Sequence, residues 1–380
     1  MKLTKLLLIF IFSFVVFTAC SSEGSSSQVS TTTSAEVIRD PSLPSQFLFS
    51  SSLPGEDHTV TEHIFVMNED GTEKRQLTDD EFRLDSGAVW SPDNLQIAFS
   101  RSCDGCSDSG LYVMNADGTE LRQIYGKESL HLSWSPDGQQ ILFSGFVGRY
   151  GVWEQIFIVN VDGTGLRQLH PYDTWNFRSA WSPDGTRVSF QSFSDKSGDG
   201  GIYVVNADGT NVNQILNFSS IFNFDRAGPH IWSPDGQKIA FVAYEDDAVP
   251  VYEEDLSHIF VMNADGSELI QLTDSRRGYT DLAWSPDGQQ FAFVADEDGW
   301  PNIFVMNADG SDVHKVISKA HTPRWSSTGE YISFYDFVDP LHFNSVGDAI
   351  RLGGEISIAL PNGTLIHSTG ISVDSFDWNG

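Results

Sequence analysis

The pentapeptide Trp-Ser-Pro-Asp-Gly occurs at residues 134–138, 181–185, 232–236 and 284–288, and variants of it begin at Trp90, Trp325 and Trp378. Ser-Pro-Asp-Gly is typical of a tight turn, because proline fixes φ at the second position and glycine accepts a left-handed conformation. The tryptophan before each turn is a large apolar group that needs a neighbour to bury it. These seven copies therefore predict a fold built from repeated modules.

A second block recurs between the tryptophan turns. It is an apolar run of strand length followed by Asn-Ala-Asp-Gly or a close variant, which is again turn chemistry. Successive tryptophans are 41 to 53 residues apart, which leaves room for four short antiparallel strands in each unit. The block occurs at 64–71, 111–118, 156–163, 202–209, 259–266 and 303–310, and a degenerate copy occurs at 356–363.

This pattern predicts an all-β fold, a β-propeller of seven four-stranded blades. Residues 372–378 have the pattern of a first strand with no successor, and residues 46–50 that of a second strand with no predecessor. We expect residues 46–50 and 372–378 to pair and to complete the closing blade from both termini. Six blades is the alternative, should the irregular stretch at 337–354 not belong to a proper blade.

The first 45 residues differ from the rest. Residues 1–19 carry two lysines and then an apolar run, as a signal peptide does, and Cys20 follows Thr18-Ala19 in a sequence that resembles the lipidation site of bacterial lipoproteins. Residues 20–45 are rich in serine and threonine and predict a flexible tether. We therefore expect a propeller at 46–380, held by a lipid at Cys20 at the bacterial cell envelope, on its periplasmic or extracellular side, with the outer membrane favoured.

The chain is strongly acidic, with 52 Asp and Glu against 22 Lys and Arg and a net charge of −30, so a nucleic-acid partner is not expected. Many of these carboxylates have a purely structural explanation, because they occupy the two turn motifs. The turn aspartates are Asp93, Asp137, Asp184, Asp235 and Asp287 in one set, and Asp70, Asp117, Asp162, Asp208, Asp265 and Asp309 in the other.

The two motifs together resemble the TolB-like, PD40 or WD40-like propeller repeats of bacterial envelope proteins, over residues 46–380. In TolB an α/β domain precedes the propeller, whereas residues 20–45 here resemble only a tether, so the partnerships of TolB are not carried over. Related propellers also cap the catalytic domain of prolyl oligopeptidases. The sequence contains no Gly-x-Ser-x-Gly nucleophile motif, so peptidase activity is not expected.

Two loops contain residue patterns that are typical of a disulfide and of a calcium site. Cys103 and Cys106 form a Cys-Asp-Gly-Cys segment, for which we expect a local disulfide in an oxidising compartment. Asp195, Ser197 and Asp199 place side-chain oxygens at the first, third and fifth positions of a loop with glycine at the sixth, like the start of a calcium loop. Asn206 stands where such a loop has its bidentate glutamate, so an ordinary turn is the competing interpretation.

Ligand-binding residues are expected on the face opposite the two short turns, because long and irregular loops gather there. This face would hold Trp153, Trp175 and Trp300, which lie outside the repeat. Residues just before each blade tryptophan would ring the mouth of the central channel, and their types vary between blades. They are Gly87, His131, Arg178, His230, Asp281, Thr322 and Ser375, with His321 beside them.

Three functions remain open. The first is a non-catalytic, monomeric propeller that binds an envelope protein or a glycan. For this function we expect no cofactor, calcium being the one exception considered, and membrane attachment only through the lipid. The second follows from resemblance: seven-bladed relatives of this repeat include oligogalacturonate lyases, which hold a metal with histidines, and His131, His230 and Asp281 are the residues that such a metal would use. The third is a structural component of the envelope.

Overall fold

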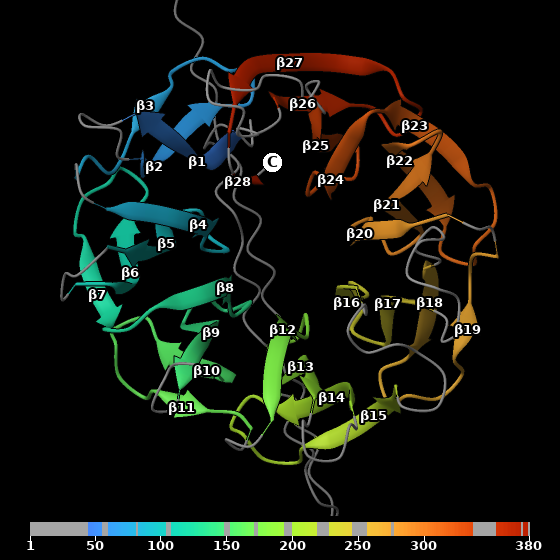
Figure 1. The fold of residues 1–380 in the computed structure, drawn as a ribbon, viewed down its shortest axis with the longest axis horizontal. Coiled ribbons are helices and arrows are strands. Elements are labelled where there is room, and N and C mark those ends of the chain that lie inside the picture. The colour runs from blue at the N-terminus through green and yellow to red at the C-terminus, as the bar shows by residue number, and fades with distance from the viewer. Residues whose placement is uncertain are drawn as a thin grey trace, which may run out of the picture. The chain divides into compact units, whose positions relative to one another are not determined.

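The computed structural model of the chain describes residues 45–54, 60–80, 83–103, 108–147, 153–170, 174–193, 200–218, 228–244, 257–274, 277–336, 355–373 and 375–378. Regular structure in these ranges is entirely β-strand, and the sheets are set one after another around a common centre (Figure 1). No helix among these residues is long and apolar enough to cross a membrane. The predicted all-β propeller is confirmed.

Five blades are separate four-stranded antiparallel sheets. Each starts at its innermost strand and runs outward, so the chain order is also the order in the sheet. Their strands are β8 Ser129–Trp134, β9 Gln140–Val147, β10 Trp153–Asn160 and β11 Arg167–Gln168; β12 Trp175–Trp181, β13 Arg187–Phe193, β14 Gly200–Asn206 and β15 Asn213–Asn217; β16 His230–Trp232, β17 Lys238–Tyr244, β18 Ser257–Asn263 and β19 Ile270–Gln271; β20 Tyr279–Trp284, β21 Gln290–Glu297, β22 Trp300–Asn307 and β23 His314–Ser318; β24 Ala320–Trp325, β25 Ile332–Asp336, β26 Glu355–Ala359 and β27 Leu365–Ser372.

The remaining eight strands form a single sheet, so the prediction of seven separate four-stranded sheets is wrong, as is the alternative of six. The two parts of this sheet are joined where Glu62 pairs in parallel with Leu84, the Glu62 amide donating to the Arg83 carbonyl at 3.4 Å. The first part comprises β28 Ser375–Trp378, β1 Gln46–Pro54, β2 Val60–Asn68 and β3 Arg75–Gln76, and the second comprises β4 Leu84–Trp90, β5 Gln96–Ser102, β6 Gly110–Asn115 and β7 Arg122–Tyr125.

The chain ends meet inside this sheet. Strand β28 pairs antiparallel with β1, from Phe47 opposite Trp378 to Ser50 opposite Ser375, as the sequence predicted. The two parts of the sheet then face each other, because Leu48 and Ile64 of one share a buried cluster with Trp90 and Phe99 of the other. The eight strands are therefore folded face to face across an apolar core.

Every neighbouring pair of blades is held in the same manner. Between the blades of β16–β19 and β20–β23, for example, Val242 and Ile259 pack on Phe291 and Phe293. Several blade tryptophans add a hydrogen bond across the interface, from the indole N–H to a carbonyl of the preceding blade at 3.2–3.3 Å. The pairs are Trp134 with Val89, Trp181 with Ser133, Trp232 with Ala180 and Trp325 with Ala283.

The turn aspartates stabilise their own turns by accepting hydrogen bonds, as expected. In the first motif Asp137 Oδ1 accepts from the Ser135 hydroxyl at 2.6 Å and from the Gln139 amide at 3.0 Å. In the second motif Asp70 Oδ1 accepts from the Thr72 amide at 2.9 Å and from its hydroxyl. These donors lower the pKa of Asp70 below its ordinary value. The same lowering is found at Asp117, Asp162, Asp208, Asp265 and Asp309.

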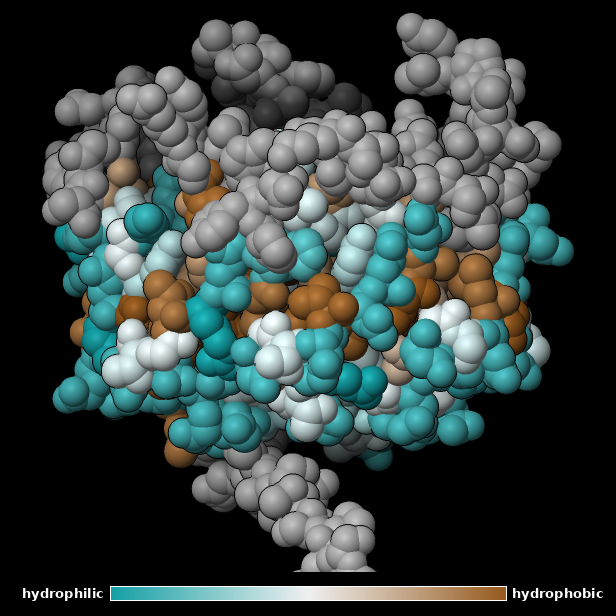
Figure 2. All heavy atoms as spheres, turned by 90° about the horizontal axis from the view of Figure 1, so that it is seen from below, coloured by the Kyte–Doolittle hydropathy of each residue, from teal (hydrophilic) through white to brown (hydrophobic). Residues whose placement is uncertain are grey.

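The side of the propeller is mostly polar. Figure 2, at right angles to Figure 1, shows hydrophilic side chains over much of the described surface and hydrophobic ones in a broken band at mid-height. Some exposed apolar side chains recur at one position, the third residue after the glycine of the second turn motif. They are Leu121, Leu166, Val212, Leu269 and Val313.

The closing contact can be tested at Phe376, which is 7% exposed and lies 5.8 Å from the Phe47 ring and 4.7 Å from the Tyr335 ring, centroid to centroid. Phe376→Ala should lower the free energy of unfolding by about 3–4 kcal/mol, measured by denaturant titration, because it leaves a cavity between β28, β1 and β25. Leu365→Ala is the control: that side chain is 54% exposed and its loss should cost under about 0.5 kcal/mol. Equal effects would contradict the packing described.

Candidate functional site

Five inner strands carry the same irregularity, a β-bulge: four belong to the separate blades, and the fifth, β4, belongs to the eight-stranded sheet. In β8 the register passes from Leu130 opposite Ser144 to Ser133 opposite Leu142, so His131 and Leu132 together face Phe143. A bulge bends its strand and redirects a side chain, and bulges often lie beside functional sites. The same jump follows Ser86, Phe177, Thr280 and His321 in β4, β12, β20 and β24.

The first residue of each bulge has a left-handed backbone and lies three positions before the blade tryptophan. Only one of the five is glycine. A side chain in this conformation is strained by roughly 1–3 kcal/mol, and such residues tend to occur at binding sites. The residues and their φ angles are Gly87 at 61°, His131 at 53°, Arg178 at 51°, Asp281 at 47° and Thr322 at 55°.

These are the residues predicted to ring the channel, and the structure places them partway along the inner strands, which lie nearest the centre in Figure 1. Their side chains differ in charge and remain at least partly accessible, with Arg178 and His131 exposed. The His131 Nδ1 atom lies 3.3 Å from Glu154 Oε1, which forms an ion pair when the imidazole is protonated. Ser375 is placed differently, with its hydroxyl 2.8 Å from that of Ser50.

His230 does not join this ring. It lies two positions before Trp232, and Pro229 occupies the position of the left-handed residue. Because the proline ring fixes φ near −65°, this blade cannot adopt the left-handed conformation there. The His230 side chain is instead 4% exposed, with Nε2 at 2.8 Å from the Ser189 hydroxyl, and burial lowers its pKa to about 4.

His321 precedes Thr322 and is the other histidine of this region. Burial lowers its pKa, and the nearby charge of Asp281 opposes that shift. Among the described residues no group of three or more His, Cys, Asp or Glu side chains is arranged to hold a metal ion. His131, His230 and Asp281 are therefore not brought together in this structure.

The tryptophans predicted for the loop face have different surroundings. Trp153 begins β10, opposite Val147, and its side chain is outside the described residues. The Trp300 ring lies under the ammonium of Lys319, the residue between β23 and β24, at 4.2 Å from ring centroid to Nζ. Trp175 begins β12 and is partly buried.

A buried polar network lies beside Trp175, and sequence reasoning missed it. Asn176 and Gln155 are fully buried, and the Asn176 amide donates to Gln155 Oε1 at 2.9 Å. The Gln155 amide in turn donates to the carbonyl of Thr174, and Gln168 donates to Gln155 Oε1 at 2.8 Å. Polar residues within otherwise apolar strands were the available signal. The network fixes the backbone on both sides of Trp175.

Several predicted residues fall outside the described ranges. The calcium candidates Asp195, Ser197 and Asp199 lie between β13 and β14, and Cys20 lies before β1. Cys103 is disulfide-bonded, but Cys106 is also outside the described ranges, so their pairing stays a prediction.

The buried histidine gives a pH dependence. The unfolded chain binds a proton at His230 with a pKa near 6.5, whereas the folded chain does so only near pH 4, so stability is lost as the pH falls between these values. Between pH 7 and 5 this group should cost about 2 kcal/mol. His230→Phe should flatten the pH dependence of the unfolding free energy in that interval, while Leu365→Ala, which removes an exposed side chain that does not titrate, should not. Parallel curves for wild type and His230→Phe would contradict the assignment.

Comparison with known proteins agrees with the propeller fold. The family model of the TolB β-propeller domain, PD40, matches residues 131–257 and 219–344. The uncharacterized protein Atu1656 of Agrobacterium fabrum is 27% identical over 240 residues, which are 56% of this chain and 77% of that protein. Among solved structures, the β-propeller domain of the trilobed protease from Pyrococcus furiosus has a TM-score of 0.59 at 15% identity, covering 86% of this chain and 96% of that one. An oligogalacturonate lyase in complex with manganese has a TM-score of 0.58 at 16% identity, covering 73% of this chain and 80% of that one. The chain belongs to the PD40 family of TolB β-propeller domains.

Proposed function

We propose that this chain is a non-catalytic propeller, anchored at the bacterial cell envelope, that binds a protein or glycan ligand along its inner strands and at the long-loop end of them. The observation that carries the proposal is the repeated bulge. Its backbone is the same in five inner strands, while its left-handed residue is a glycine in one strand and carries an imidazole, a guanidinium, a carboxylate or a hydroxyl in the others.

Packing alone does not explain these side chains. Gly87 occupies the same position of β4 and adopts the conformation without strain, and no atom lies within 4 Å of where its Cβ would be. His131, Arg178, Asp281 and Thr322 retain strain that glycine would relieve, and they differ from one another. A set of distinct polar side chains on a constant backbone is what recognition of one particular ligand requires.

Trp175 supports the same conclusion from the loop end. The amide network of Asn176 and Gln155 holds the backbone at Trp175 in one conformation. A backbone that is already ordered around an aromatic residue reduces the conformational entropy lost when that residue contacts a ligand. Trp175 is thus the loop residue that we expect to contribute most.

The envelope location belongs to the same proposal. Residues 1–19 have the pattern of a signal peptide and Cys20 that of a lipidated cysteine, which suits a family of TolB-like propellers.

The proposal is tested by replacing the four strained residues with glycine, singly and together. Each change should alter the unfolding free energy by less than about 1 kcal/mol, because relieved strain offsets the added freedom of the unfolded chain. Binding to the ligand, recovered from envelope extract by wild-type protein and identified, should weaken at least about tenfold for Arg178→Gly or Asp281→Gly.

Leu95→Gly, at an exposed turn position, is the matched control and should leave binding unchanged. Undiminished binding by the quadruple glycine variant would contradict a ligand site on the inner strands. Turnover of uronate polymers by the wild-type protein, lost on chelation, would replace the binding proposal with the lyase.

A further inference from the structure

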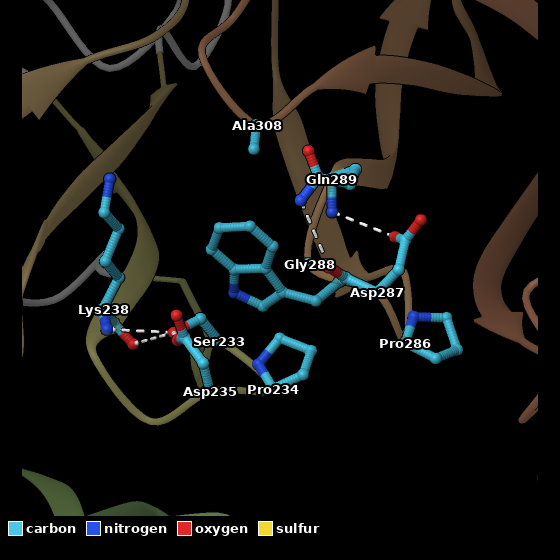
Figure 3. A pocket seen from close by; sticks show the side chains of 10 residues that line it. Ser233, Pro234, Asp235, Lys238, Pro286, Asp287, Gly288, Gln289 and Ala308 are labelled. Carbon is cyan, nitrogen blue, oxygen red and sulfur yellow. Dashed lines mark hydrogen bonds between the residues drawn. The ribbon is translucent and has the colours of Figure 1, made fainter.

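A groove lies between the blades of β16–β19 and β20–β23, at the end where the Trp-Ser-Pro-Asp-Gly turns lie. Its volume is about 390 Å³, and it is separate from the bulges of the inner strands. Figure 3 shows its labelled side chains around an indole ring, with Lys238 on one side and Gln289 on the other. The lining residues of this groove include one tryptophan, Trp284.

Trp284 departs from the arrangement of its counterparts. Four other blade tryptophans donate the indole N–H to the preceding blade. The Trp284 nitrogen is buried and has no acceptor among the described residues, as is also true of Trp90 and Trp378. Its ring lies 3.9 Å from Phe291, centroid to centroid, and is only partly buried. The ring therefore packs on its own blade and leaves a face toward the groove.

The preceding blade also leaves this ring open. At the neighbouring interface the Arg187 guanidinium covers the Trp232 ring at 4.8 Å and donates to the Gly236 carbonyl. Lys238 is the equivalent residue for Trp284. Its ammonium has no ion pair, hydrogen bond or ring contact within the described ranges, and the side chain is exposed.

Both hydrogen-bond donors and acceptors surround the ring. Asp235 and Asp287 each accept two bonds at Oδ1 within their turns, which lowers the pKa of both carboxyl groups, while Oδ2 has no partner among the residues described. Lys238 supplies an ammonium donor, and Gln289 supplies an amide whose nitrogen donates one bond to the Asp287 carbonyl at 3.4 Å and keeps a second N–H. The two carboxylates outnumber the one ammonium, so the groove does not favour an anion.

We infer that this groove binds a neutral pyranose residue. One C–H face of the sugar would stack on Trp284, its hydroxyls would donate to Asp235 and Asp287, and its oxygens would accept from Lys238 and Gln289. Hydroxyl groups both donate and accept, so they match a rim that offers both. The volume of the groove suits one or two sugar rings. This site is distinct from the one in the proposed function.

The test uses the purified chain and neutral methyl glycosides of glucose, galactose and mannose, with N-acetylglucosamine and glucuronic acid alongside. Binding is followed by saturation-transfer NMR and tryptophan fluorescence. At least one neutral sugar should bind saturably with a Kd on the order of 1 mM, as a ligand of this size allows. Trp284→Phe should weaken it at least about tenfold and Lys238→Met about threefold.

Trp284→Phe also disturbs packing, so a second variant fills the groove from its edge. Ala308→Leu should abolish binding, whereas Ala264→Leu, at the equivalent turn beside the covered Trp232, should not. Val161 already occupies this turn position in another blade, so a larger side chain is tolerated there. No binding of any neutral sugar, tighter binding of glucuronic acid, or equal effects of the two leucine variants would each overturn the inference.

Discussion

The face-to-face packing of neighbouring sheets is the contact on which the rest of this structure depends. Each blade presents apolar side chains on both faces, and Phe291, Phe293 and their counterparts are buried only because another blade covers them. A sheet of four short strands cannot bury two apolar faces alone, so the blades are stable only as a set. The pairing of β1 with β28 completes this set, and the turn aspartates keep each hairpin in register.

Because the stabilising contacts lie between the blade faces, the inner strands are free to depart from regular geometry. The bulges at His131, Arg178, Asp281 and Thr322 use that freedom. The Trp284 groove is a second departure, in which an interface keeps its buried cluster but leaves one aromatic ring partly uncovered. In the first feature the side chains vary on a repeated backbone, and in the second one interface packs differently from its neighbours. Both occur at positions where the core does not require the repeat to be kept, which is how a repeat protein acquires specificity.

The sequence predicted what depends on local chemistry. Pro and Gly at fixed positions identified the turns, continuous apolar runs of strand length identified the strands, and the ends of the chain were correctly paired. It did not predict the joining of β2 to β4, because the Glu62 to Leu84 pairing depends on how two blades approach each other. The left-handed residues gave no sequence signal, since His131 and Arg178 look like ordinary strand residues. His230 was predicted in the ring although it lies two residues before its tryptophan, whereas the ring residues lie three before theirs; Pro229 occupies that third position in this blade.

The central claim is that strained, chemically distinct side chains on repeated bulges form the recognition surface of this propeller. Its most direct test is a crystal structure in which carbonyl oxygens are individually visible. The account predicts positive φ angles at His131, Arg178, Asp281 and Thr322, with their side chains turned toward the propeller axis. Extended backbone at these four residues, with their side chains buried between blades as that of His230 is, would contradict it.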